Sequence, residues 1–98
     1  MKPRFPHPGT LLREEFLEPL GITPYRLAQA IGVPLTRITA ILATKRSVTA
    51  DTGLRLDRYF GLSEGFWLGL QQDYDLRKAK RELGKTLSRI QPRHLAAA

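Results

Sequence analysis

Cysteine is absent from this chain of 98 residues, long apolar runs are absent too, and acidic residues are few. Without cysteine, neither a disulfide framework nor a thiolate metal site is possible. No apolar run follows the N-terminal residues, and no stretch approaches the length of a membrane-spanning helix. We therefore expect neither a signal peptide nor a membrane partner, and the sequence predicts a soluble, cytoplasmic protein.

Positive charge is what the chain has in excess. Lys and Arg number 16 against 9 Asp and Glu, which gives a formal net charge of +7. An excess of this size on a small domain indicates a polyanionic partner, most often nucleic acid, and a merely soluble basic surface is the alternative. The basic residues gather near the C-terminus, at Arg77, Lys78, Lys80, Arg81, Lys85, Arg89 and Arg93. This run either lies over a DNA backbone or is a solvated helix face.

Helix start and stop signals recur at short intervals and predict five helices in one compact all-α domain over residues 1–98. No run alternates apolar and polar residues as a strand would. The first helix begins at His7-Pro8-Gly9 and ends at Pro19-Leu20-Gly21, and the fifth, capped by Ser63, continues into a basic tail at about residues 77–98. The residues expected at the inner faces are Leu12, Phe16, Leu17, Leu20, Leu27, Ala28, Ile31, Ile38, Ile41, Leu42, Leu56, Tyr59, Phe60, Phe66, Trp67, Leu70 and Tyr74.

Two short helices joined by a glycine-containing turn form the central signal, between about residues 23 and 46. Ala28 allows close approach of the partner helix, Gly32 permits the tight turn, and Ile38 fixes the second helix to the first. The second helix of such a pair protrudes, and a helix of this diameter fits the DNA major groove. An ordinary helical hairpin inside a bundle is the alternative, and the basic loop that follows the pair favours DNA binding.

The predicted DNA contacts fall on this helix pair and its flanks. Arg37, near the start of the second helix, has the fork geometry that recognises guanine, and its alternative is a solvated or carboxylate-paired side chain. Ala40 either contacts a thymine methyl or is simply a small residue near the turn. Thr23 caps a helix whose N-terminus favours a phosphate, and Leu35 either contacts a base or covers the core. The full predicted set is Thr23, Leu35, Thr36, Arg37, Thr39, Ala40, Lys45 and Arg46, of which the last two contact phosphates.

Several strings of the sequence resemble the HigA family of antitoxins, which belong to the Xre/Cro type of helix-turn-helix proteins with a lambda-repressor-like fold. The matching strings are HPG at 7–9, LREEFLEPLGI at 12–22, LAQAIGVP at 27–34, TRI at 36–38, TADTGLRLDRYFGLSEGFWLGLQ at 49–71 and YDLRKAKRELG at 74–84. Two positions depart from the family: Thr10 stands where members often have Glu, and Leu35 where they often have Arg. The second departure puts the operator sequence in doubt, because it falls at an expected base-reading position.

The resemblance implies a homodimer that binds a palindrome in its own promoter and represses it. It also implies a cognate toxin, commonly a RelE-like ribonuclease, that the protein binds and neutralises. Two rival functions share the helical bundle: a Cro- or C-type repressor without a toxin partner, and an interaction adaptor that has lost DNA binding. A neighbouring gene for a small basic ribonuclease separates the first rival from an antitoxin, and a salt-dependent DNA-binding assay separates the second.

Acidic and apolar residues outside the helix pair give candidates for the other two partners. The first helix carries the chain's one acidic cluster, Glu14, Glu15 and Glu18, which we expect to dock on a basic toxin away from the DNA-reading face. Complementing the helix dipole is the alternative role of these residues. The fifth helix is longer than so small a bundle needs, and its Leu76, Leu83 and Leu87 are the predicted dimer contacts.

No residue pattern indicates catalysis. His7 and His94 lie far apart near the two ends, and a capping or turn role suits His7, which precedes a proline. Asp73 and Asp75 point to different faces of their helix. The sequence contains no metal-ligand spacing, nucleophile elbow or phosphate loop, so we expect neither an enzyme nor a cofactor nor a metal site.

Overall fold

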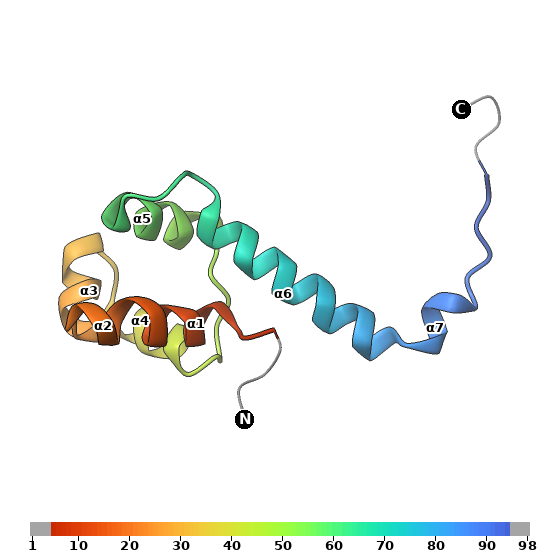
Figure 1. Cartoon of the computed structure of the whole chain (residues 1–98), viewed down its shortest axis with the longest axis horizontal. Coiled ribbons are helices and arrows are strands. Elements are labelled where there is room, and N and C mark those ends of the chain that lie inside the picture. Colours follow the sequence, from red (N-terminus) through yellow and green to blue (C-terminus); the bar gives the residue numbers. More distant parts are fainter. Residues whose placement is uncertain (1–4, 95–98) are drawn as a thin grey trace.

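The computed structural model describes residues 5–94, and every regular element within them is a helix. The all-helical prediction is thereby confirmed, and Figure 1 shows the arrangement. In chain order the elements are α1 (Pro8–Leu11), η1 (Leu12–Leu17), α2 (Glu18–Leu20), α3 (Pro24–Ile31), α4 (Leu35–Leu42), α5 (Ala50–Phe60), α6 (Phe66–Leu83) and α7 (Lys85–Ser88). The first three follow one another without a break and form the first predicted helix.

The first helical segment begins with a histidine cap and widens in its middle. Nδ1 of His7 accepts the N–H of Gly9 at 2.9 Å, which confirms the predicted capping role. Within η1 the helix takes a π turn, and the N–H of Glu18 bonds to the carbonyl of Arg13, five residues earlier. Pro19 follows at once, and a proline has no N–H for the carbonyl four residues before it, so a regular α-helix cannot run through this point.

The α3–α4 turn forms where the sequence predicts it. Oγ1 of Thr23 accepts the N–H of Arg26 at 3.1 Å and caps α3. Gly32 ends the helix in the left-handed region at φ 73°, a conformation that side chains with a Cβ rarely adopt. Arg55, on α5, donates through Nη1 to the carbonyls of Ile31 at 2.8 Å and of Gly32 at 3.3 Å. The carbonyls at the end of α3 are therefore satisfied by a side chain that is distant in sequence.

A buried carboxylate shapes the corner between α5 and α6. Asp57 is 2% exposed, and its two oxygens accept the N–H groups of Gly65 at 2.9 Å and Trp67 at 3.2 Å. These N–H groups lie at the start of α6, where a helix has no internal acceptors for them. The expectation that Ser63 caps this helix is wrong, because Gly65 occupies the cap position and the capping carboxylate comes from α5.

The core lies where the helices converge on Trp67, which is fully buried and packs against Phe16 with tilted rings whose centroids are 5.1 Å apart. Three residues predicted to face inward are exposed instead: Leu20 at 60%, Tyr59 at 42% and Phe66 at 40%. Each lies near the end of its helix. The buried apolar residues are Leu12, Leu17, Leu27, Ala28, Ile31, Val33, Ile38, Ile41, Leu42, Val48, Leu56 and Trp67.

The second half of α6 extends beyond the bundle. Figure 1 shows it leaving the other helices and carrying α7 at its far end. All residues from 75 to 94 are exposed, and the Cα radius of gyration of 16.9 Å exceeds the value of about 13 Å for a closely packed domain of this length. The basic segment lies on this projecting half. Among the described residues, no helix is both long and apolar enough to cross a membrane.

Candidate nucleic-acid interface

Helix α4 presents one face to the core and another to solvent. Ile38 and Ile41 are fully buried, and Leu42 is nearly so. On the outer side, Leu35, Thr36 and Thr39 are exposed, whereas Arg37 and Ala40 are half-buried. The hydroxyl of Thr39 donates to the carbonyl of Thr36 at 3.2 Å, which leaves its oxygen lone pairs as acceptors toward solvent. The predicted base-contacting residues of α4 therefore lie on or beside its solvent face.

Arg37 has a carboxylate neighbour in the free protein. Its Nη1 lies 3.6 Å from Oδ1 of Asp51 on α5, and the same oxygen accepts Nε of Arg55 at 2.8 Å. Since Arg55 also donates to the α3–α4 turn, a continuous polar network joins that turn to α4. Nε of Arg37 is buried without a hydrogen-bond partner, so the guanidinium is not fully satisfied within the protein. The sequence showed the Asp51–Arg55 spacing of one helical turn, but nothing local linked Asp51 to Arg37.

The loop after α4 carries Lys45 and Arg46, both exposed. It leaves the helix through Thr44, whose φ of 59° is unusual for a β-branched residue, and the N–H of Lys45 then bonds to the carbonyl of Ala40 at 2.9 Å. Farther on, the N–H of Val48 donates to Oε1 of Gln71 on α6 at 2.8 Å. The loop backbone is thus fixed at both ends, and the two basic side chains extend from a defined base.

The start of α3 and the end of α4 lie beside one hollow. Its lining includes Arg13, Thr23 and Leu42. Nη2 of Arg13 donates to the carbonyl of Leu42 at 2.6 Å, which satisfies the C-terminal end of α4 from the first helical segment. Thr23 is exposed, and its hydroxyl is used as a cap. Sequence reasoning missed Arg13 and Gln71 as supports of this region, because both act on backbone groups far away in the chain.

The residues predicted for other partners lie outside this interface. Glu15 and Glu18 are exposed, and Glu14 is half-buried. Leu76, Leu83 and Leu87 lie on the projecting half of α6 and on α7, with exposed fractions of 69%, 44% and 45%. Within residues 5–94, no group of His, Asp or Glu side chains has the arrangement of a metal site.

Known proteins of similar sequence include virulence-associated proteins, helix-turn-helix transcriptional regulators and an antitoxin. No family model matches the chain. Virulence-associated protein I of Dichelobacter nodosus is 47% identical over 76 residues, covering 78% of this chain and 70% of that protein. Antitoxin HigA-1 of Vibrio cholerae is 31% identical over 84 residues, covering 86% of this chain and 79% of the antitoxin.

A solved structure extends this similarity to the fold. The antitoxin HigA of Pseudomonas aeruginosa, in a structure with the higBA promoter, matches with a TM-score of 0.86 at 40% identity. The match covers 91% of this chain and 98% of that one. Sequence and fold agree over the helix-turn-helix and most of the remaining chain, and the chain belongs to the HigA family of helix-turn-helix antitoxins.

Proposed function

We propose that this protein is an autoregulating antitoxin, which binds operator DNA through α4 and neutralises a toxin of RelE-like ribonuclease type. The observation that carries the DNA-binding half is the solvent face of α4, with exposed Thr36 and Thr39, the incompletely satisfied Arg37, and the fixed loop of Lys45 and Arg46. The solved relative, an antitoxin HigA with the higBA promoter, supports DNA binding as such. The net charge of +7 supplies the long-range attraction to DNA.

The protein acts on DNA as a two-fold dimer, because one helix-turn-helix reads only a few base pairs. The two α4 helices then enter successive major grooves of a palindrome, about 34 Å apart. Contact between two copies of the chain along the projecting half of α6 is supported by three exposed apolar side chains, Leu76, Leu83 and Leu87. Apolar side chains that gather on one solvent-facing segment indicate an interface.

Operator binding tests the role of Arg37. Arg37→Ala is expected to cost about 1–3 kcal/mol per half-site on the operator and to relax the preference at one base pair. Arg37→Lys is the matched variant: it keeps a cation for Asp51 but loses the fork that recognises guanine, so it should lose base preference as well. Affinity for operator and for random DNA is measured by fluorescence anisotropy across a salt series.

Lys45→Ala provides the contrast in the same assay. It should weaken binding to all sequences alike and lower the salt slope by about one unit, as loss of a phosphate contact does. Arg58→Ala, at an exposed position of α5, removes one positive charge outside the predicted DNA contacts and serves as the control. Equal weakening of operator and random DNA by Arg37→Ala would refute the assignment of α4 as the base-reading helix.

The acidic cluster on the first helical segment supports a surface for the toxin. A ribonuclease that grips RNA is basic, so a partner of net positive charge needs a local acidic surface for fast encounter. Glu15 and Glu18 are exposed there, and the neighbouring Arg13 donates to the carbonyl of Leu42. These carboxylates are available to a basic partner.

Charge reversal tests the toxin surface. Glu14→Lys with Glu18→Lys should lower toxin affinity by about tenfold or more while operator affinity is retained. Glu64→Lys with Glu82→Lys reverses two acidic residues elsewhere and is the charge-matched control. Unchanged toxin affinity in the folded double variant would rule out this surface. A protein that binds its operator but no co-encoded toxin would instead be a repressor alone.

A further inference from the structure

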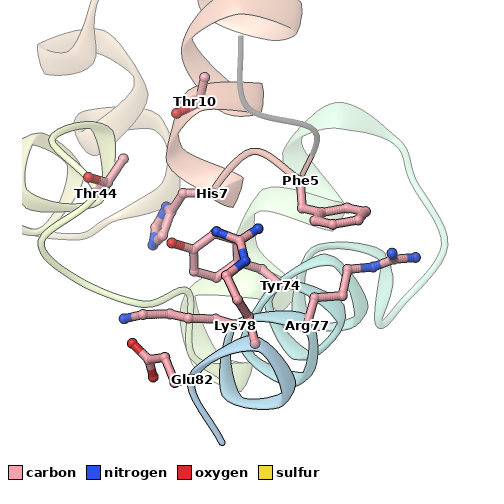
Figure 2. Close-up of a pocket in the computed structure, with 9 residues that line it drawn as sticks. Phe5, His7, Thr10, Thr44, Tyr74, Arg77, Lys78 and Glu82 are labelled. Carbon is pink, nitrogen blue, oxygen red and sulfur yellow. The ribbon is translucent and has the colours of Figure 1, made fainter. Parts of the chain in front are cut away.

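A hollow of about 350 Å³ lies between the segment that precedes α1, the loop after α4 and the middle of α6. Figure 2 shows His7 between Thr44 and Tyr74 at one side of this hollow, with the α6 side chains below. The lining consists of Phe5, His7, Thr10, Thr44, Tyr74, Arg77, Lys78, Arg81 and Glu82. A second hollow of about 200 Å³ shares four of these residues, His7, Thr44, Tyr74 and Lys78, and reaches Lys45 and Arg46. We call the two together the trough.

The trough contains a recessed hydrogen-bond donor. His7 is only 8% exposed, and its Nδ1 accepts the N–H of Gly9. Burial lowers the pKa of His7, Lys78 lowers it further, and the carboxylate of Asp75 opposes both effects. The neutral ring then carries its proton on Nε2. No described residue accepts a hydrogen bond from this N–H, so Nε2 is a donor that faces the solvent of the trough and is open to a ligand.

The charge of the trough is positive and only partly compensated. Arg77 is engaged, because its Nε lies 3.0 Å from Asp73 and its guanidinium lies 4.2 Å from the ring centroid of Phe5. Lys78 and Arg81 form no ion pair within residues 5–94. Two carboxylates line the trough, those of Glu82 and Asp75, and the latter accepts Nε2 of Gln71 at 2.9 Å.

These groups define the chemistry of a ligand. The imidazole N–H, the ammonium of Lys78 and the guanidinium of Arg81 are donors only, and the hydroxyls of Thr10 and Thr44 lie beside them. A compact anion with several acceptor oxygens matches such a set, and the rings of Phe5 and Tyr74 can take an apolar part. Because His7 is recessed, a terminal phosphate reaches its N–H more readily than a phosphodiester flanked by two sugars. We propose that the trough binds the terminal phosphate of a small phosphorylated molecule.

Nuclear magnetic resonance of the full chain without DNA tests this site. Inorganic phosphate, and separately a nucleoside 5′-monophosphate, are titrated at neutral pH and constant ionic strength. The resonances of His7, Thr44, Tyr74 and Lys78 should shift and saturate. Lys78→Met with Arg81→Met should weaken binding by about tenfold or more, since two charge-assisted contacts are lost.

Two further variants separate the site from general charge and from folding. Lys80→Met with Lys85→Met removes the same charge from exposed positions outside the trough lining and should change affinity by less than about twofold. His7→Asn keeps a side-chain acceptor for the N–H of Gly9 but lacks the Nε2 donor. It should fold and bind phosphate more weakly.

Three outcomes would overturn the proposal: no saturable shift with either ligand, equal weakening by the two double-methionine variants, or full phosphate affinity in folded His7→Asn. A phosphate of DNA is the other source of the same chemistry. It is indicated if phosphate does not saturate the site while Lys78→Met with Arg81→Met lowers the salt slope of operator binding by about two units. That result also overturns the site for a small molecule. The titration contains no DNA, so its failure leaves the proposed DNA-binding function untouched.

Discussion

Gly9→Ala is expected to destabilise the fold by about 3 kcal/mol, at the upper end of the usual cost of forcing extra atoms into a packed interior. A Cβ at this position would lie 1.8 Å from the carbonyl oxygen of Ile41 and 2.8 Å from its carbonyl carbon. Both obstructing atoms belong to the backbone of α4, so no side-chain rotation relieves the overlap. Either α1 moves away from α4 or α4 itself shifts.

Urea denaturation followed by circular dichroism measures this effect. Gly69→Ala is the matched control, because its Cβ would have nothing within 4 Å and the residue lies inside α6. It should stabilise the protein by about 0.5–1 kcal/mol through lower chain entropy. If Gly9→Ala unfolded at the same urea concentration as the parent protein, α1 could not lie so close to α4.

The second large effect is expected for Asp57→Ala, which should cost about 3 kcal/mol. The substitution leaves the N–H groups of Gly65 and Trp67 without their acceptor at the start of α6, and an unsatisfied buried donor costs about 1–3 kcal/mol. Asp57→Asn keeps one acceptor oxygen and should lose less. Urea unfolding followed by the fluorescence of Trp67 reports directly on this corner of the bundle.

The control for Asp57 is Asp73→Ala. Asp73 is exposed and makes a surface ion pair with Arg77 at 3.0 Å, so its loss should change stability by less than about 1 kcal/mol. A small effect of Asp57→Ala, comparable with that of the control, would show that the α5–α6 corner does not depend on the buried carboxylate.

Features with local causes were predictable from the sequence. Thr23 and Pro24 indicate the start of α3, and Gly32 indicates its end, because caps and turns depend on a few adjacent residues. The alternation of buried and exposed positions on α4 follows from helical periodicity alone. The DNA-contact predictions rest on this periodicity and remain predictions.

The supports of the candidate site were not predictable in the same way. Gln71 holds the loop at Val48, and Arg13 satisfies the carbonyl of Leu42, across separations of 23 and 29 residues. No periodicity encodes such contacts, since they depend on how helices pack. The exposure of Tyr59 and Phe66 has the same origin: spacing gives the face of a helix but not whether another element covers it.

The projecting half of α6 has an energetic consequence for whatever it binds. Beyond Asp75 every residue of the helix is exposed in large part, and an isolated helix of so few residues is only marginally stable in water. This half of the helix therefore unfolds locally at little cost in free energy. The turns around the buried Trp67 unfold only when the core unfolds. The contacts of a partner that orders the projecting half must offset the loss of conformational entropy. This loss costs about 1–2 kcal/mol for each residue that becomes ordered. Binding to this segment is consequently weaker than the buried area suggests. Substitutions that change helix propensity at solvent-facing positions alter the affinity for the partner, although they lie outside the interface.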